Sequence, residues 1–275
     1  MAWRLGLLAL CALFLLGGCQ KPKDSPALEM ICPDVGQGSA TLLRTGEGDV
    51  LIDAGCENRQ DELCRKLRAL GVERLALLIL THPDEDHIGG ADVILENFEI
   101  DAVWTNGAVA ENDSYERFLQ AIADAEIALK TVRAGDGITL GEMHLSVLSP
   151  QSELSGEENE DSLVLLLRCN SFGALLMGDV GETSERTIIE AYGSHLDVDV
   201  LIVGHHGANS STGTALLEAA SPEYAVISCG AGNSYGHPDG RLLARLQDAE
   251  VEVCRTDLEG DIVFSVFENA FDRTK

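Results

Sequence analysis

The segment Thr81–Gly90 ("THPDEDHIGG") concentrates side chains that can do chemistry. His82, Asp84, Asp86 and His87 fall within six positions, directly after the apolar run "LALLIL". Unpaired carboxylates this close together repel one another and are costly to bury, so we expect a positive partner among them. Imidazole and carboxylate ligands without thiolate suit Zn²⁺ or Mn²⁺. The spacing therefore predicts two divalent metal ions in this loop; the alternative is a solvated acidic loop.

Further polar clusters follow other apolar runs and speak against that alternative. They are "PDVGQG" with Asp34, "MGDV" with Asp179, "VGHHGANSS" with His205 and His206, and "NSYGHPDG" with His237. Polar residues gathered just past the ends of neighbouring strands build a site at one rim of a sheet rather than a core. Asp179 is the candidate to bridge two metal ions.

Composition limits the classes of partner. The 275 residues include 46 acidic and 19 basic ones, giving a formal net charge of −27. This charge works against loose attraction to nucleic acid or to an anionic membrane. Aromatic residues make up only 5%, so the sequence shows no stacking platform for single strands.

The N-terminus has the pattern of an export signal. Residues 1–18 carry a single Arg4, an apolar run and then small residues, and Leu16 to Cys19 ("LGGC") resembles a bacterial lipobox. We therefore expect a lipoprotein signal peptide over 1–18, lipid on Cys19 and a flexible tether over 19–27. The protein would be exported and anchored to the membrane only by its lipid, on the periplasmic or cell-surface side. An ordinary signal peptide or a single anchor helix are the alternatives.

Six cysteines remain beyond the lipid site. Export permits disulfides, and Cys56 and Cys64 are the pair closest in sequence, but buried thiols explain the scattered positions equally well. No C-x-x-C spacing occurs, which argues against a zinc ribbon.

From residue 28 the chain alternates short apolar runs, turn signals and amphipathic segments. Helical spacing is clearest over 57–70, 114–127 and 240–250, whereas 74–81 is apolar on both faces and predicts a strand in a covered sheet. The runs "VEVCRT" and "GDIVFSV" look like a final strand pair. The acidic stretch 152–161 looks the least ordered. Two sheets packed face to face, with helices outside, accommodate this order of elements.

Seven motifs together carry a family resemblance. In chain order they are "DVGQG", "THPDEDHIGG", "NEDSLVLLL", "LLMGD", "DVDVLIVGHHG", "NSYGHP" and "RTDLEG". Their order resembles the metallo-β-lactamase fold superfamily, and most closely its ComEC-type branch, the soluble domain of the competence DNA-uptake channel. The resemblance covers about Leu28 to Val266. It implies an α/β four-layer αββα sandwich over 28–275, a dinuclear site at one edge and hydrolytic chemistry, with a nuclease or phosphodiesterase role in this branch.

The resemblance also implies a set of metal ligands. His82 and Asp84 would hold the first metal ion, and Asp86 and His87 would hold the second. Asp179 would bridge the two ions. His237 would complete the second site.

Other roles follow in the same way. His205 and His206 resemble the paired histidines of the family, which with the ligand Asp86 form the catalytic set, one of them binding the scissile phosphate or protonating the leaving oxygen. Asp34 resembles the carboxylate that orients a ligand imidazole, although a plain turn residue is the alternative. Near the expected third ligand of the first ion stand two further candidates, Asn159 and Asp161.

Some positions depart from the family pattern. Ser39 replaces an acid after "DVGQG", and Ala208 and Asn209 follow "HHG" where relatives usually have Ser and a cation. The missing cation and the net charge argue against tight binding of duplex DNA. His144 and His195 fall outside the motifs and are predicted to be structural.

The sequence thus predicts a lipid-anchored dinuclear metallohydrolase that cuts phosphodiesters, with DNA as one candidate substrate, by attack of a metal-bridging hydroxide. A hydrolase of a lactam, lactone or thioester is the first alternative. The second is a non-catalytic lipoprotein of a DNA-uptake machine. The loops around 107–117 and 151–161 would decide between substrates.

Overall fold

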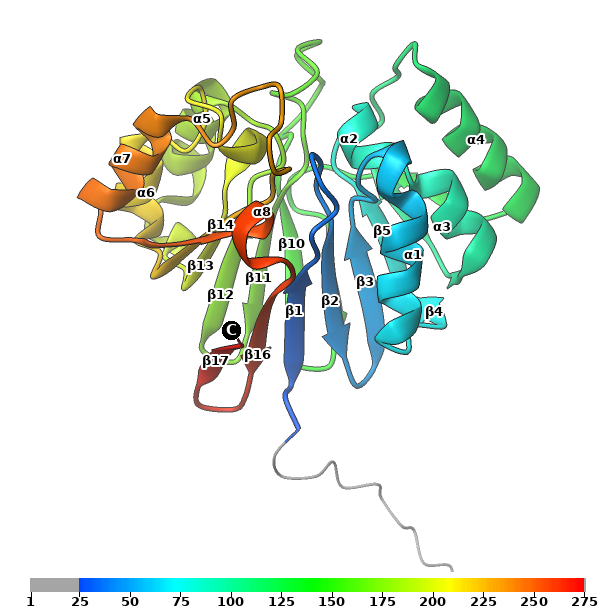
Figure 1. Ribbon diagram of the computed structural model, residues 1–275, viewed down its shortest axis with the longest axis horizontal. Helices are drawn as coiled ribbons and strands as arrows, with labels where there is room; N and C mark the ends of the chain where they lie inside the picture. The colour runs from blue at the N-terminus through cyan, green and yellow to red at the C-terminus, as the bar shows by residue number, and fades with distance from the viewer. Residues whose placement is uncertain (1–24, 275) are drawn as a thin grey trace, which may run out of the picture.

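Two β-sheets form the centre of the molecule. The computed structural model describes residues 25–274, and its sheets lie between two groups of helices (Figure 1). The first sheet has the strand order β17 (Phe271–Thr274), β16 (Ile262–Val266), β1 (Leu28–Cys32), β2 (Thr41–Thr45), β3 (Gly48–Ile52), β5 (Leu77–Leu80), β7 (Val103–Thr105) and β8 (Leu129–Thr131). The second has the order β15 (Glu252–Arg255), β14 (Tyr224–Ile227), β13 (Val200–Ile202), β12 (Phe172–Leu176), β11 (Val164–Cys169), β10 (Met143–Ser149) and β9 (Gly137–Leu140). A small separate pair joins β4 (Arg74–Leu75) to β6 (Glu99–Ile100).

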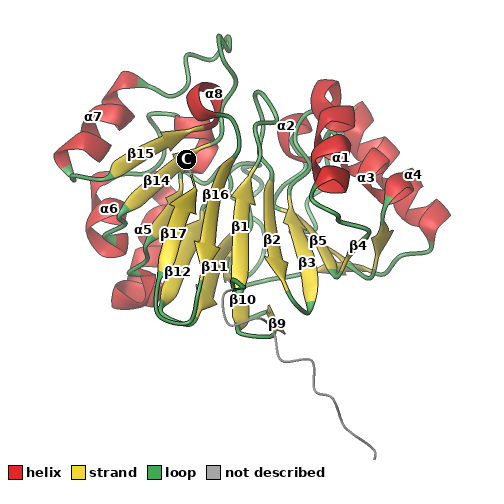
Figure 2. Ribbon diagram, turned by 60° about the horizontal axis from the view of Figure 1, so that its bottom comes forward, coloured by secondary structure: helices red, strands yellow, loops and turns green. Residues whose placement is uncertain are grey.

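Helices cover the outer face of each sheet. On the first sheet lie α1 (Gln60–Ala69), α3 (Ala91–Asn97) and α4 (Asp113–Ala125); on the second lie α5 (Glu182–Tyr192), α6 (Thr214–Ala220) and α7 (Gly240–Asp248). Figure 2 shows the strands between these flanking groups. The shorter elements are α2 (Glu85–Ile88), α8 (Thr256–Glu259), η1 (Glu57–Arg59), η2 (Gly193–Leu196) and η3 (Gly204–Gly207). The predicted four-layer αββα sandwich is confirmed.

The layers follow from the alternation of side chains along each strand. In β2, Leu43 faces the core between the sheets while Leu42 packs under the helices of the first sheet. In β5, Ile79 and Leu78 divide in the same way. The strand predicted over 74–81 is therefore buried on both faces, as expected, although a break at Ala76 divides it into β4 and β5.

The predicted final strand pair is wrong. β15 pairs in parallel with β14 in the second sheet, whereas β16 pairs antiparallel with β1 in the first. The short helix α8 lies between β15 and β16 and carries the chain from one sheet to the other, so no hairpin forms there. β16 instead forms an antiparallel pair with β17, a strand that was not predicted from the sequence.

Two predictions concern the N-terminal region and the thiols. The signal peptide over 1–18, Cys19 and most of the tether lie outside the described residues. Within residues 25–274, no helix has both the length and the apolar character needed to cross a membrane. Cys56 and Cys64 do not form a disulfide, and Cys64 is buried as a thiol.

Candidate metal centre

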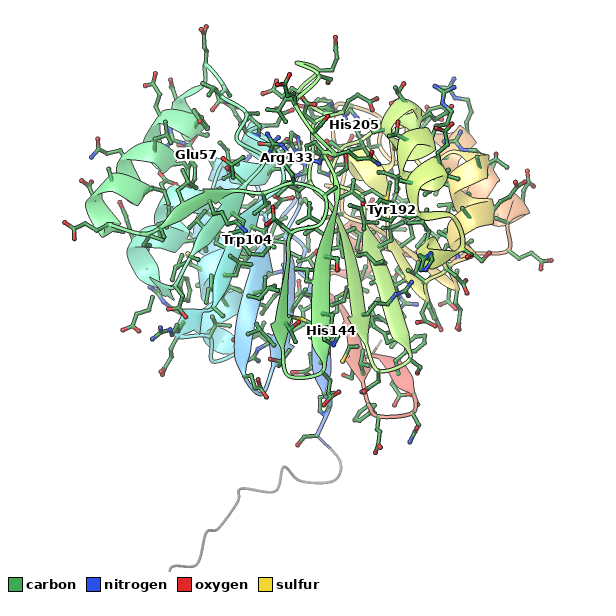
Figure 3. The ribbon with its side chains drawn as sticks, turned by 180° about the vertical axis from the view of Figure 1, so that it is seen from behind. Glu57, Trp104, Arg133, His144, Tyr192 and His205 are labelled. Atoms are coloured by element: carbon green, nitrogen blue, oxygen red, sulfur yellow. The ribbon has the colours of Figure 1, made fainter. Side chains whose placement is uncertain are left out.

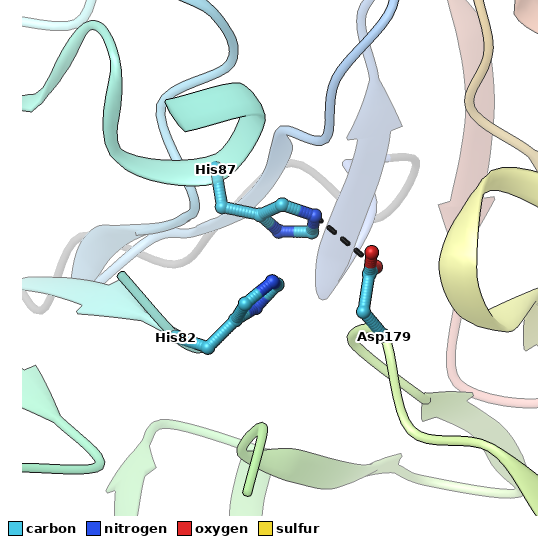
Figure 4. Close-up of side chains that lie close together, drawn as sticks. All are labelled: His82, His87 and Asp179. Atoms are coloured by element: carbon cyan, nitrogen blue, oxygen red, sulfur yellow. Dashed lines mark ion pairs between the residues drawn. The ribbon is translucent and has the colours of Figure 1, made fainter. Parts of the chain in front are cut away.

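The connection from β5 to α2 carries the densest group of candidate ligands. His82 and His87 are both buried, each 1% exposed, and their ring centroids are 4.1 Å apart. The extended backbone of Asp84 immediately precedes α2, which begins at Glu85 and turns the chain back so that His87 comes over His82. Figure 4 shows both rings beside Asp179, which comes from the opposite sheet. The segment thus forms half of a site that the second sheet completes.

The second sheet contributes Asp179 after β12 and His206 after β13. His87 Nε2 lies 3.1 Å from Asp179 Oδ1, and His206 Nε2 lies 3.7 Å from the other oxygen of that carboxylate. His206 Nε2 is also 3.1 Å from Asp86 Oδ2 and 3.2 Å from His87 Nε2. We call Asp86, His87, Asp179 and His206 the inner group. Its three residues other than Asp86 are buried.

Each imidazole is held from behind through Nδ1. His87 Nδ1 donates to Asp53 Oδ2 at 2.7 Å, and His206 Nδ1 donates to the Ser228 carbonyl at 2.9 Å. The Thr81 hydroxyl, which donates to Asp53, lies 3.1 Å from His82 Nδ1. These bonds leave the Nε2 atoms of His87 and His206 facing Asp179, and the Nε2 atom of His82 facing Asp84. This is how proteins orient histidines that bind metal ions.

A second group lies beside the first, in the connection between β5 and α2. His82 Nε2 is 3.6 Å from Asp84 Oδ2, and although this nitrogen is fully buried it has no hydrogen-bond partner. A buried polar atom without a partner is costly. We call His82 and Asp84 the outer group. The unpartnered nitrogen and the nearby carboxylates fit a divalent metal ion bound by N and O ligands.

The acids and histidines of the inner group shift one another's pKa values. Burial alone would lower the pKa of His87, but the Asp179 and Asp53 carboxylates raise it well above its ordinary value. Burial would raise the pKa of Asp86, yet the hydrogen bond from His206 and the positive charges of His87 and His206 lower it to about 2. The same two histidines hold the pKa of Asp179 well below its ordinary value against the effect of burial. In the metal-free protein, protons on the imidazoles thus balance the carboxylates, where a metal ion would otherwise do so.

The carboxylate behind an imidazole is Asp53, not Asp34. The side chain of Asp34 accepts a hydrogen bond from the Gly36 N–H at 2.9 Å, which is the turn role considered as the alternative. Asp53 is 1% exposed, follows β3 and accepts from both His87 and Thr81. Asp53 was not predicted from the sequence, because a single Asp in "LIDAG" carries no motif. Its place after an apolar strand was the available signal.

The positions of His206 and His237 differ from those expected. His206, expected to contact substrate, lies among the metal ligands, whereas His237 lies outside the ligand groups found in the described residues. The His237 ring is 5.8 Å from that of His205 and 5.8 Å from that of Tyr235, on which it stacks. His205 Nε2 is 3.8 Å from Asp179 Oδ2 and its side chain is 31% exposed. His205 and His237 therefore line the approach to the inner group.

The backbone conformation of their turn sends the side chains of His205 and His206 in different directions. His205 and His206 both have left-handed φ values, 50° and 52°, which are unfavourable for residues with a Cβ. The surrounding loop holds them there: Ser211 Oγ donates to the Gly204 carbonyl at 2.7 Å, and the buried Glu185 accepts from the N–H groups of Thr212 and Gly213. This strained turn directs His206 inward and leaves His205 at the opening.

Asp161 lies in no His, Cys, Asp or Glu ligand group of the described residues. The Asp161 carboxylate accepts from the N–H groups of Ser155 and Gly156, at 2.7 and 2.9 Å, and so closes the loop on itself. The Asn159 carbonyl accepts from the Ser162 N–H. The acidic stretch expected to be poorly ordered is thus a hydrogen-bonded loop. Glu158, which was not predicted as a site residue, lines the same cleft as Asp84.

A cleft of about 680 Å³ opens above Asp84 and Asp86. Its walls are mostly polar and acidic, with Arg59 as the cationic side chain of the lining, and with these carboxylates: Asp34, Asp84, Glu85, Asp86 and Glu158. Tyr235 stands at its edge, 69% exposed. Figure 3 shows His205 at the end of the sheets where the loops gather, and His144 along the strands toward the other end. His144 pairs with Thr139 on its own hairpin, in keeping with the structural role predicted for it.

Comparison with known proteins agrees with this architecture. Residues 33–231 match the family model of the metallo-beta-lactamase superfamily. The chain is 31% identical to ComE operon protein 3 of Bacillus subtilis over 84% of this chain and 32% of that protein. It is 30% identical to competence protein ComA of Neisseria gonorrhoeae over 93% of this chain and 35% of that protein. The chain therefore spans about a third of the length of these curated relatives.

Solved structures share the fold at low sequence identity. The metallo-beta-lactamase fold protein YhfI of Bacillus subtilis has a TM-score of 0.57 at 12% identity, covering 86% of this chain and 98% of that one. Igni18, a metallo hydrolase from Ignicoccus hospitalis, has a TM-score of 0.56 at 13% identity, covering 86% and 99%. Together with the family match, the His/Asp cluster and the two sandwiched sheets, these findings show that the chain belongs to the metallo-β-lactamase superfamily and carries a hydrolase-like domain related to competence proteins.

Proposed function

We propose that this protein is a metal-dependent hydrolase of phosphodiesters that binds two divalent ions. The observation that supports this most is the convergence of the His87 and His206 Nε2 atoms on the Asp179 carboxylate, with His82 in the same ligand group as His87 and Asp179. The inner group would hold one ion and the outer group the other, with Asp179 between them. The relation to competence proteins favours a phosphodiester over other esters.

The bound ions would supply electrophilic polarisation of the phosphoryl oxygens and a nucleophile at neutral pH. The protein's own side chains would orient the ligand histidines and move protons. Asp53 and Ser228 keep His87 and His206 in the tautomer that leaves Nε2 free. His205, half-exposed at the opening, is placed to donate a proton to a leaving oxygen. Burial, followed by the nearby His205 and His206, lowers the pKa of His237, so this ring is neutral at pH 7 and suited to accept a hydrogen bond.

The shape and charge of the cleft favour a small phosphodiester. Its acidic walls would repel a long polyanion, and Arg59 is already paired with Glu62 at 2.6 Å. DNA would then enter as an end or a short strand rather than as a bound duplex, because duplex binding needs many cations along the backbone.

The test is a substrate panel with defined metals. The full chain, purified in mild detergent and supplied with Mn²⁺ or Zn²⁺, should hydrolyse bis(p-nitrophenyl) phosphate. Asp86→Ala and His87→Ala should abolish this activity, and His144→Ala should retain it. Turnover of a lactam, lactone or thioester without phosphodiester turnover would instead support the first alternative. Retention of DNA by a chain that hydrolyses nothing would support the non-catalytic one.

We further propose that the protein acts outside the cytoplasmic membrane, attached through lipid on Cys19. The support is the "LGGC" pattern after a short apolar run. Expression with radiolabelled palmitate should label the wild-type chain, and Cys19→Ser should lose both the label and the membrane association. A Cys19→Ser chain that stays with the membrane would point to an anchor helix.

A further inference from the structure

The loop 208–213, which follows the histidine pair, is held by an arginine from a later helix. Arg245 lies in α7 and is half-buried. Its Nε donates to the Thr212 carbonyl at 3.2 Å and its Nη1 to Asn209 Oδ1 at 2.9 Å. Its Nη2 donates to the carbonyls of Asn209 and Ser211, at 3.1 and 2.9 Å. All three nitrogens of the guanidinium are therefore bonded to this one loop.

An acid holds the same loop from the other side. The carboxyl group of Glu185, a residue of α5 that is 2% exposed, accepts from the Thr212 N–H and, at 2.9 Å, from the Gly213 N–H. Thr212 is thus bonded to an acid of α5 at its N–H and to a base of α7 at its carbonyl. Its φ of 53° is unfavourable for a residue with a Cβ, and such a conformation persists only where the surroundings impose it.

Two side chains of the loop connect it to the histidine pair. Ser211 Oγ donates to the Gly204 carbonyl at 2.7 Å, and Thr212 Oγ1 accepts from the Gly204 N–H at 3.3 Å. Both backbone groups of the residue before His205 are therefore bonded to the loop. Gly204, Ser211 and Thr212 are all buried, so breaking either bond would leave a buried polar group without a partner, which is costly. The position of the loop thus fixes where the left-handed turn begins.

We propose that Arg245, with Glu185 opposite it, is a positioning residue for the turn that carries His205 and His206. Its bonds run to the loop, and it acts on the two histidines through Gly204. This rests on the proposed function, in which His206 binds the inner ion and His205 donates a proton. A loosened loop would let the side chain of His206 turn away from the inner group, whereas the outer group comes from the other sheet and would be unaffected.

The first test follows the turn in the metal-free protein. Long-range ¹H–¹⁵N NMR spectra of the full chain report the ring nitrogens of the histidines, assigned from single histidine variants. Arg245→Lys keeps the positive charge but loses the planar set of donors. The signals of His205 and His206 should shift in this variant, whereas those of the distant His144 should not. Arg186→Lys is the matched control, because it makes the same substitution at an exposed residue of α5, and it should shift none of these signals.

The second test measures metal binding and does not depend on turnover. The metal-free full chain is titrated with Mn²⁺, and free Mn²⁺ is followed by electron paramagnetic resonance. Arg245→Lys should weaken one equivalent about three- to tenfold, at or below the lower end of the loss for groups directly behind a ligand, and leave the other within about twofold. His206→Ala should weaken the same equivalent. Adding Arg245→Lys to His206→Ala should change that affinity less than about twofold, because the arginine acts through the histidine.

Histidine signals or Mn²⁺ affinities unchanged by Arg245→Lys would overturn the proposal, as would equal effects of Arg186→Lys or full additivity with His206→Ala. If Arg245→Lys does not fold, Glu185→Gln loosens the opposite side of the loop and should shift the same signals. A wild type that binds no Mn²⁺ would refute the proposed function, and the NMR comparison would still decide the positioning role. A wild type that binds two ions but cleaves no phosphodiester would refute only the function.

Discussion

The inner and outer groups of the metal centre are built in opposite ways. Every imidazole of the inner group has a fixed partner behind it, and three of its four members are buried. In the outer group, Asp84 is partly exposed and His82 Nε2 has no hydrogen-bond partner. The inner site has both imidazoles paired with acids before an ion arrives, whereas in the outer site His82 Nε2 is left without a partner.

This difference has a consequence for affinity. A ligand set that is already oriented loses little conformational entropy on binding, whereas exposed side chains must be ordered at that moment. We therefore expect the inner ion to bind more tightly and the outer ion to exchange more readily. The cleft opens above Asp84, so under the proposed function a substrate would approach over the outer group.

Removing the carboxylate shared by the two groups should have the largest effect. Asp179→Asn weakens the ligand that His87 and His206 both face, so we expect binding of both ions to fall more than about a hundredfold, beyond the range seen for residues behind a ligand. Hydrolysis should be lost as well. Mn²⁺ titration measures this, with His144→Ala as the control at a distant histidine. Loss of only one equivalent would show that Asp179 does not bridge.

Asp53 and Asp34 offer a direct test of which acid supports the inner group. Asp53→Asn removes the charge behind His87 Nδ1 and should weaken the inner ion about 10–100-fold. Asp34→Asn alters a turn at Gly36 and should change that affinity less than about threefold. Competition with a fluorescent chelator resolves the two variants. Equal effects would return Asp34 to the role that its motif implied.

Chelation should separate the two ions in time. When the Mn²⁺-loaded chain is dialysed against rising chelator, we expect the outer equivalent to leave first, at a concentration about tenfold below that needed for the inner one. Metal analysis of the retained protein follows both steps. Departure of both ions in one step would show that the two groups do not differ as proposed.

The smallest expected effect is on stability against pH in the metal-free protein. The Asp179 and Asp53 carboxylates raise the pKa of His87, and Asp179 and Asp86 raise that of His206, both against burial. Their contribution to stability is therefore complete below the ordinary value of 6.5 and is lost as the pH rises through the raised folded-state values. The melting temperature of the metal-free chain should fall from pH 6 to 9, and Mn²⁺ should reduce this fall because the ion replaces the protons.

Glu185 would add to the same trend and needs its own control. Burial raises its pKa from 4.5 to about 7, so its contribution is present below 4.5 and is lost as the pH rises through 7. Glu185→Gln removes this contribution and keeps an acceptor oxygen for one of the two N–H groups, Thr212 or Gly213. If the fall in melting temperature persists in Glu185→Gln, the inner group causes it. If the fall disappears, Glu185 causes it.

The sequence by itself determined the fold and the chemical type of the site. Alternating and covered apolar runs sufficed for the sandwich, and the "THPDEDH" segment for a His/Asp metal site, because strand periodicity and ligand chemistry are local properties of the chain. The sequence did not show that β15 and β16 lie in different sheets, because an apolar segment has the same pattern in either sheet.

Only the tertiary structure decided which of several like residues lies where. Asp53 rather than Asp34 stands behind His87 because β3 pairs with β5, which brings the ends of those two strands together. His206 rather than His237 enters the inner group because two consecutive left-handed residues turn it inward. The acidic stretch 152–161 is ordered because Asp161 and Glu160 tie it down. Each outcome depends on strand register, a strained turn or a long-range hydrogen bond, none of which is encoded in the spacing of the residues concerned.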